Sequence, residues 1–230
     1  MFYRINQIFF ILINKIWSLI FIFFLSCSHN DNGKFYDYTE GDILFQDLDS
    51  SPLCDAIELV TPGYNNFNIS HIGVIVKDNN ELKVLEAIPN SVKLTNIDSF
   101  LLRSLDSNNQ PKVMVGRLKN QYKKHIPQAI SFMKEKIGDK YDNEFILNNN
   151  MYYCSELIYE AFEKSNIFEL KPMTFIHPNT GDTLEIWKNY YEKLKIKIPE
   201  GKLGINPGIM STSNKINIIH EFGVFSKSKN

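Results

Sequence analysis

Two short apolar runs separated by a polar turn form the clearest pattern in this sequence. The first run covers residues 69–77, the second covers residues 81–89, and Asp78-Asn79-Asn80 lies between them. Apolar runs of this length, bounded by turn residues, predict strands. Aspartate and asparagine favour the turn because their side chains bond to the local backbone. The pattern therefore predicts an antiparallel hairpin.

The length of the turn decides which side chains of this hairpin share a face. With a two- or four-residue loop centred on Asn79-Asn80, Gly73 pairs with Glu86, and side chains alternate between faces with period two. His71 and Glu86 then lie diagonally on one face, about 7–8 Å apart at the backbone. A one-residue slip would send them to opposite faces. A carboxylate within an apolar strand is costly to bury unpaired, which favours a partner. The alternatives are a rim carboxylate and a strand-edge histidine bonded to backbone.

A helical pattern starts at Cys154. The apolar residues that follow have the i, i+3, i+4 spacing of one helix face, and they are Leu157, Ile158, Ala161 and Phe162. The unpaired N–H groups and the dipole at a helix N-terminus favour an anion, and hence a thiolate. A thiolate is a strong nucleophile when a base and an oxyanion site lie beside it. The alternative is a half-buried cysteine that fills the core.

The remaining patterns predict several short elements. Strands are expected near residues 43–46, 112–118 and 220–225, and helices over residues 51–60, 96–105, 126–137 and 180–194. Cys54 falls early in the predicted helix 51–60. It could be a second nucleophile, a disulfide partner of Cys154 or a small core residue, and the last is expected because no base signal surrounds it. His125, His177 and His220 are expected to be surface or structural residues.

Composition limits the classes of function. A length of 230 residues fits one domain plus a targeting segment. The net charge is -1, and no basic stripe with interleaved aromatic residues indicates a nucleic-acid partner. The sequence has no CxxC pair, no clustered His/Cys spacing and no glycine-rich phosphate loop. We therefore expect no metal, no nucleotide cofactor and no nucleic acid.

The N-terminal 26 residues are very apolar and carry only Arg4 and Lys15 as charges. A basic start, an apolar middle and the small Ser26 before a cut describe a secretory signal. Cys27 directly after Ser26 resembles a bacterial lipobox, in which this cysteine is lipidated and becomes the mature N-terminus. An uncleaved membrane anchor is the alternative, because residues 1–26 are long enough to span a bilayer.

The predicted organisation follows from this N-terminus. Residues 1–26 are a lipoprotein signal peptide, residues 27–35 a polar tether, residues 36–225 the folded domain and residues 226–230 a frayed tail. The protein is then expected in the bacterial cell envelope, lipid-anchored to a membrane and facing the periplasm or the exterior.

Five sequence blocks in this order resemble the circularly permuted branch of the NlpC-type papain-fold cysteine hydrolases, the YiiX-like group. They are Gly41-Asp42-Ile43-Leu44-Phe45, Ser70-His71-Ile72-Gly73-Val74, Val84-Leu85-Glu86-Ala87, Gly138-Asp139-Lys140-Tyr141-Asp142 and Tyr152-Tyr153-Cys154-Ser155-Glu156-Leu157. In ordinary papain-like enzymes the cysteine precedes the histidine. Here the histidine comes first, as a permutation of that fold gives.

The resemblance implies an α+β permuted papain-like fold, with an antiparallel sheet packed on the helix that carries the nucleophile. It implies Cys154 as nucleophile, His71 as general base and Glu86 as third member of a triad. Binding residues are implied as well: Tyr141 and Tyr153 line the pocket, and Asp42 is structural or pocket-lining. The backbone N–H of the cysteine is expected to donate to the oxyanion.

The implied activity is cleavage of an amide bond through an acyl-enzyme, without a cofactor. The substrate is a small molecule, peptide or lipid, either a peptidoglycan stem peptide or an N-acyl compound. Two alternatives stay open. One is a lipid acyl hydrolase or acyltransferase that uses the same triad, and the other is a non-catalytic lipoprotein that binds a partner.

Overall fold

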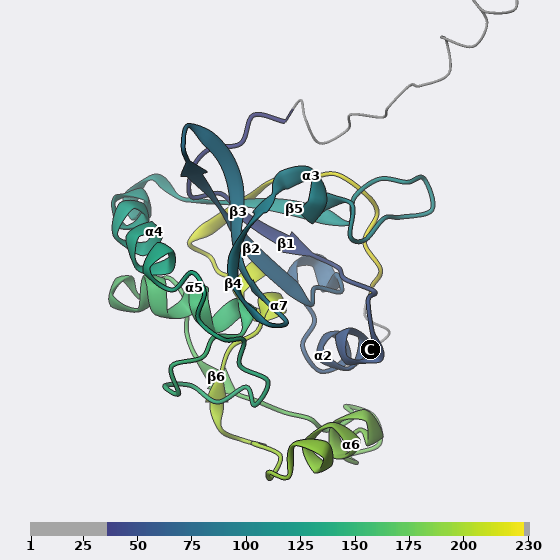
Figure 1. Ribbon diagram of the computed structural model, residues 1–230. Coiled ribbons are helices and arrows are strands. Elements are labelled where there is room, and N and C mark those ends of the chain that lie inside the picture. Colours follow the sequence, from purple (N-terminus) through teal and green to yellow (C-terminus); the bar gives the residue numbers. More distant parts are fainter. Residues whose placement is uncertain (1–35, 228–230) are drawn as a thin grey trace, which may run out of the picture. The chain divides into compact units, whose positions relative to one another are not determined.

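A six-stranded antiparallel sheet forms the centre of the computed structural model, which describes residues 36–227 (Figure 1). The strand order is β4-β3-β2-β1-β5-β8, and every neighbouring pair is antiparallel. The six strands are β1 (Ile43–Gln46), β2 (His71–Asp78), β3 (Glu81–Ile88), β4 (Ser91–Asn96), β5 (Val113–Leu118) and β8 (Ile216–Glu221). A separate ribbon pairs β6 (Lys171–Pro172) with β7 (Leu203–Gly204).

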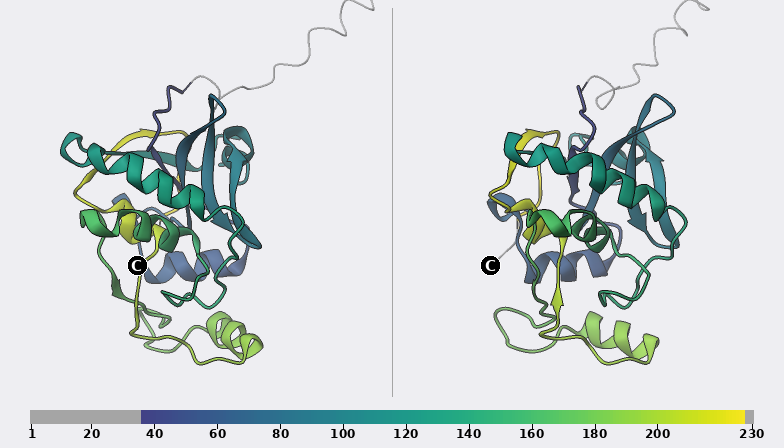
Figure 2. Two further views of the ribbon diagram at one scale, coloured as in Figure 1. Left: turned by 60° about the vertical axis from the view of Figure 1, so that its left-hand side comes forward. Right: turned by 90° about the vertical axis from the view of Figure 1, so that its left-hand side faces the viewer.

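Helices cover both faces of this sheet. One face carries α4 (Ile126–Glu135) and α5 (Cys154–Phe162), which lie side by side (Figure 2). The short helix α3 (Ile97–Leu101) covers β3 and β4 on the other face. The remaining helices are α2 (Pro52–Val60), α6 (Glu185–Leu194), α7 (Pro207–Ser211) and the 3-10 turns Tyr64–Asn66, Asn120–His125 and Glu163–Ser165.

Alternation along β2 fills both layers of the core. Ile72 and Val74 pack with Leu157 of α5, whereas Ile75 packs with Phe100 of α3. Each of these five side chains is completely buried. Because successive strand residues point to opposite faces, one apolar strand can anchor a helix on each side.

The β2–β3 hairpin has the predicted register. Lys77 pairs with Leu82, and the two-residue turn consists of Asn79 at φ 46° and Asn80 at φ 67°. Turns with two positive φ values match the right-handed twist of hairpin strands, and asparagine tolerates that conformation. The predicted even-length loop is therefore confirmed.

Several predicted boundaries are wrong. The expected helix 96–105 is limited to α3, and residues 91–96 before it form β4, which pairs with β3. Helix α6 begins at Glu185 rather than at residue 180, and the last strand ends at Glu221. Strand pairing decides the bounds of β4 and of the last strand, because β preference reflects packing against a neighbouring strand more than local sequence.

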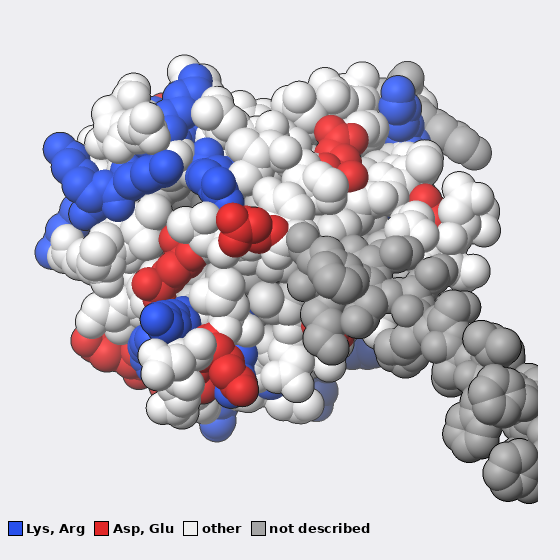
Figure 3. All heavy atoms as spheres, turned by 90° about the horizontal axis from the view of Figure 1, so that it is seen from above, with Lys and Arg blue, Asp and Glu red and all other residues white. Residues whose placement is uncertain are grey.

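Charges of both signs occur on the surface of the domain. On the face seen from above, lysine and arginine side chains gather at one side, with acidic side chains next to them (Figure 3). None of the helices in residues 36–227 has the length and apolar character needed to cross a bilayer. The predicted signal peptide, the tether and Cys27 lie outside the described residues.

Candidate active site

Cys154 and His71 come from different layers of the fold and meet where their elements begin. Cys154 is the first residue of α5, and His71 is the first residue of β2. The start of α5 is fixed by the backbone N–H of Tyr153, which donates to the Glu156 carboxylate at 3.3 Å. Helix α5 packs on β2, and Cys154 is close enough to the His71 imidazole to raise its pKa. Both residues are buried, with 7% of Cys154 and 5% of His71 exposed.

The imidazole of His71 also contacts Glu86. The distance between Nε2 of His71 and Oε2 of Glu86 is 2.6 Å, and Glu86 is fully buried. The register of the hairpin thus brings together the pair that its spacing predicts. Since Nε2 faces the carboxylate, Nδ1 is the ring nitrogen left for the thiol.

Glu86 has two further partners that the sequence did not indicate. Arg103, just after α3, donates from Nη1 to Oε2 at 2.7 Å and from Nη2 to Oε1. The hydroxyl of Thr95 on β4 donates to Oε1 at 2.5 Å. A correct prediction of β4 and of its pairing with β3 would have indicated Thr95. No local pattern marks Arg103, which is 17 residues away from Glu86 in the chain.

These contacts fix the charges of the cluster. Burial alone raises the pKa of Glu86, but Arg103 and His71 lower it to about 2. Burial lowers the pKa of His71, but hydrogen bonding to Cys154 and Glu86 raises it to about 9. At neutral pH the site therefore holds a carboxylate and an imidazolium next to the thiol, the arrangement that stabilises a thiolate.

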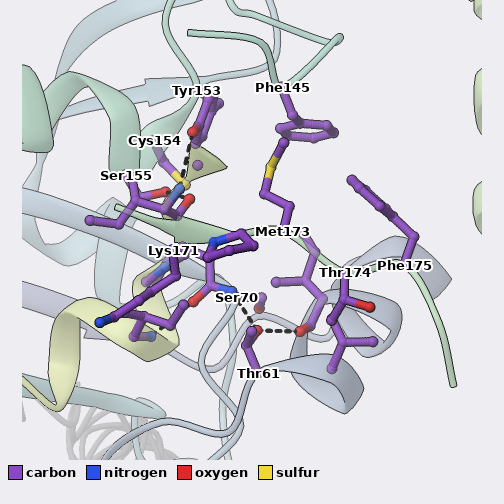
Figure 4. Close-up of a pocket in the computed structure, with 18 of the residues that line it drawn as sticks. Thr61, Ser70, Phe145, Tyr153, Cys154, Ser155, Lys171, Met173, Thr174 and Phe175 are labelled. Atoms are coloured by element: carbon purple, nitrogen blue, oxygen red, sulfur yellow. Dashed lines mark hydrogen bonds between the residues drawn. The ribbon is translucent and has the colours of Figure 1, made fainter. Parts of the chain in front are cut away.

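Cys154 opens onto a cavity of about 90 Å³ (Figure 4). Its walls are mostly apolar, and Phe145, Met173 and Phe175 gather to one side of Cys154 (Figure 4). Trp187 of α6 completes this apolar part. Apolar pockets with a few polar groups are typical of sites for small molecules.

Tyr141 and Tyr153 both line this cavity, as predicted. The hydroxyl of Tyr153 accepts a hydrogen bond from the backbone N–H of Ile205 at 3.4 Å. The hydroxyl of Tyr141 has no hydrogen-bond partner among the described residues. Burial, and next the charge of Cys154, raise the pKa of Tyr141 well above its ordinary value. Tyr141 is thus a neutral phenol that can donate a hydrogen bond to a ligand.

Asp42 does not line this cavity, so the prediction that it is a substrate-binding residue is wrong. It precedes β1, whereas Gln46 at the other end of β1 pairs with His71. The carboxylate of Asp42 accepts two hydrogen bonds from Arg117, both at 2.7 Å. It also accepts from the backbone N–H of Thr39 at 2.8 Å. Of the two roles left open by the sequence, Asp42 has the structural one, because Arg117 occupies both of its oxygens.

Cys54 and Cys154 are both free thiols, so the two do not form a disulfide. Cys54 is buried near the start of α2 and its sulfur lies 3.5 Å from the hydroxyl of Ser50 and 3.6 Å from that of Ser51. Among residues 36–227, no histidine or carboxylate is hydrogen-bonded to it, and it packs as a small residue of the interior.

Comparisons with known proteins relate the chain to one family. The sequence profile of the permuted papain-like amidase enzymes, the YaeF/YiiX or C92 family, matches residues 37–220. A crystal structure described as metalloprotein yiiX from Escherichia coli O157:H7 has a TM-score of 0.68 and 20% sequence identity to this chain. That match covers 82% of this chain and 100% of the other. A search of curated protein sequences gave no match. The predicted α+β permuted papain-like fold is confirmed.

The E. coli structure is described as that of a metalloprotein. Within residues 36–227 of this chain, no three His, Cys, Asp or Glu side chains are grouped so that they could hold a metal ion.

Proposed function

Since this chain belongs to the family of permuted papain-like amidases and is a cysteine hydrolase, we propose that Cys154 is its nucleophile, His71 its general base and Glu86 the residue that orients the base. The observation that carries this proposal is that His71 bonds to Glu86 through Nε2 at 2.6 Å, while Cys154 at the start of α5 is close enough to raise the pKa of the same imidazole. This is the relation of nucleophile, base and orienting group in a catalytic triad.

The reaction begins with a proton on His71 and a thiolate on Cys154. The thiolate attacks the carbonyl carbon of an amide, and the carbonyl oxygen becomes an oxyanion. The backbone N–H of Cys154, which donates to no described group, stabilises this charge, and the phenol of Tyr141 adds a second donor. His71 gives its proton to the amide nitrogen, the C–N bond breaks, and the amine leaves a thioester on Cys154.

Hydrolysis of the thioester returns the site to its first state. Neutral His71 takes a proton from water, and the hydroxide attacks the thioester carbonyl. The C–S bond breaks, the acid is released, and thiolate and imidazolium form again. Glu86 keeps the imidazole in one tautomer and stabilises its positive form in both halves of the reaction.

We propose that the preferred substrate is an amide with an apolar acyl group rather than a peptidoglycan stem peptide. The apolar walls of the cavity at Cys154 support this choice, since stem peptides carry many polar and charged groups. Esters of the same acyl groups are a second candidate, because the same thioester would form from them.

The test is incubation of the full chain with three substrates at equal concentration: a long-chain N-acyl amino acid, a stem peptide and a long-chain ester. Mass spectrometry of the products should show release of fatty acid from the N-acyl compound, and acid quenching should trap the acyl group on Cys154. Cleavage of the stem peptide alone would reject the proposed acyl specificity. If none of the three substrates were turned over and Cys154 were unreactive, a non-catalytic binding module would be favoured.

Replacement of Met173 by lysine is expected to reduce kcat/KM for the long-chain substrate about 10- to 100-fold, because a charge would enter the apolar wall. Cleavage of an N-acetyl substrate, which does not reach this wall, should change little. Leu203→Lys is the matched control, since this residue of β7 is exposed and does not line the cavity. Equal losses for both acyl lengths would argue against an acyl-binding role.

We propose that the domain is held in the bacterial cell envelope by a lipid on Cys27. The apolar segment 1–26 and the position of Cys27 after Ser26 support this. When expressed in a bacterium that processes lipoproteins, Cys27→Ser protein is expected to lack the added mass of the lipid. It should also be absent from the processed protein in the membrane fraction. Unchanged size and membrane retention would instead favour an uncleaved anchor.

A further inference from the structure

Arg103 makes the most extensive contact of any side chain with Glu86. Its guanidinium spans the carboxylate in a two-pronged arrangement, with Nη1 on Oε2 and Nη2 on Oε1. Oε2 is also the atom bonded to Nε2 of His71. A planar guanidinium matches a carboxylate in this way and fixes the plane of the carboxylate as well as its position.

The surroundings hold Arg103 in this geometry. Its Cζ atom lies 5.3 Å from the centre of the Phe100 ring, and the imidazole of His71 lies 5.7 Å from the same ring. The backbone carbonyl of Phe100 accepts a hydrogen bond from the side chain of Gln46 at 2.9 Å, and Gln46 pairs with His71 across β1 and β2. One end of α3 is therefore tied both to Arg103 and to the strand next to the histidine.

No other charged group competes for Glu86 among the described residues. His71 contacts it from β2, Thr95 from β4, and Arg103 from the segment after α3. Lys93 is opposite Glu86 in the β3–β4 pairing, but its side chain is exposed and forms no described ion pair. The carboxylate is completely buried, so an uncompensated charge there would be unfavourable.

We propose that Arg103 is a positioning residue that keeps Glu86 ionised and in one orientation, and thereby directs His71 toward Cys154. The inference rests on the proposed function of the triad. It goes beyond it because the orienting group of the triad is then an Arg–Glu pair rather than a single carboxylate. Arg103 does not line the cavity and acts through Glu86, without contact to substrate.

The expected consequence of losing Arg103 has a definite sign. Without the guanidinium, a buried Glu86 is held by His71 and Thr95 alone, so it gains a proton more readily and turns more freely. The site also loses one positive charge. Both changes make the thiolate at Cys154 less favourable, so its reactivity at low pH should fall more than its reactivity at high pH.

The test compares Arg103→Gln with Arg117→Gln in the full chain. Arg117 also donates two hydrogen bonds to one buried carboxylate, that of Asp42, although it does so from Nε and Nη2 rather than from both Nη atoms. Its side chain is 30% exposed against 23% for Arg103. The two variants therefore remove similar ion pairs at different distances from Cys154. Alkylation of Cys154 by iodoacetamide, followed by peptide mass spectrometry at pH 6 and pH 9, reports on the site without a substrate.

The ratio of the alkylation rate at pH 6 to that at pH 9 is expected to fall about tenfold in Arg103→Gln and to stay unchanged in Arg117→Gln. The Arg103→Lys variant keeps the positive charge but loses the two-pronged hydrogen bonding, so its ratio of alkylation rates should be intermediate. It also carries the test if Arg103→Gln does not fold, with Arg117→Lys as its control.

Two outcomes would overturn the proposals, and they differ. Equal ratios in the Arg103 and Arg117 variants, with rapid alkylation of the wild type at pH 6, would reject the role of Arg103 alone. Slow alkylation of the wild type at pH 6, as for an ordinary thiol, would reject the triad and Arg103 with it.

Discussion

Cys154→Ala protein is expected to lose turnover by at least about 10⁴-fold, to the background of the uncatalysed reaction, while its fold persists. The reason is chemical, because no other described side chain can form the thioester next to His71. Alanine is smaller by one sulfur atom at a site that borders an open cavity, so the cost in stability should be small. The measurement is product formation from the N-acyl substrate, together with thermal unfolding.

Cys54→Ala is the matched control for this prediction. It removes the same group from a buried position near the start of another helix, where no base contacts the sulfur. Its activity is expected to equal that of the wild type. If Cys154→Ala retained full activity, or if Cys54→Ala lost it, the assignment of the nucleophile would be wrong.

His71→Ala is expected to reduce kcat/KM about 10⁴- to 10⁶-fold and also to slow the alkylation of Cys154 at neutral pH. His71 holds the proton that the leaving amine needs, and its positive charge stabilises the thiolate. The loss of both should therefore appear in turnover and in thiol reactivity. His220→Ala is the control, because His220 lies on the edge strand β8 and stacks on Tyr36 at a ring distance of 4.6 Å.

The pH dependence of the wild type gives an independent check. The pKa of His71 is raised to about 9, so the imidazolium persists through neutral pH and is lost as the pH rises through about 9. Above that value His71 cannot protonate the leaving amine, and kcat/KM for the amide should decline. A profile that already declines near pH 6.5, the ordinary range of histidine, would contradict the contacts of His71 with Cys154 and Glu86.

Local patterns were sufficient for parts of the fold. The Asn79-Asn80 turn fixed the register of the hairpin, since an even loop between two apolar runs leaves one arrangement that buries the right face. The apolar spacing after Cys154 placed this residue at the start of α5. The strand β4 cannot be predicted in this way, because its residues become a strand through pairing with β3 and carry only a weak signal of their own.

The sequence by itself determined that His71 and Glu86 share a face, and that Cys154 begins a helix. Both conclusions rest on the periods of strands and helices, which are local properties of the chain. Only the tertiary structure decided that this helix packs on β2, so that the cysteine and the histidine meet. It also brought Arg103 to Glu86, Arg117 to Asp42, and the residues around Met173 and Trp187 into a cavity wall. These contacts join residues far apart in the chain, and no periodicity records which surfaces will pack together.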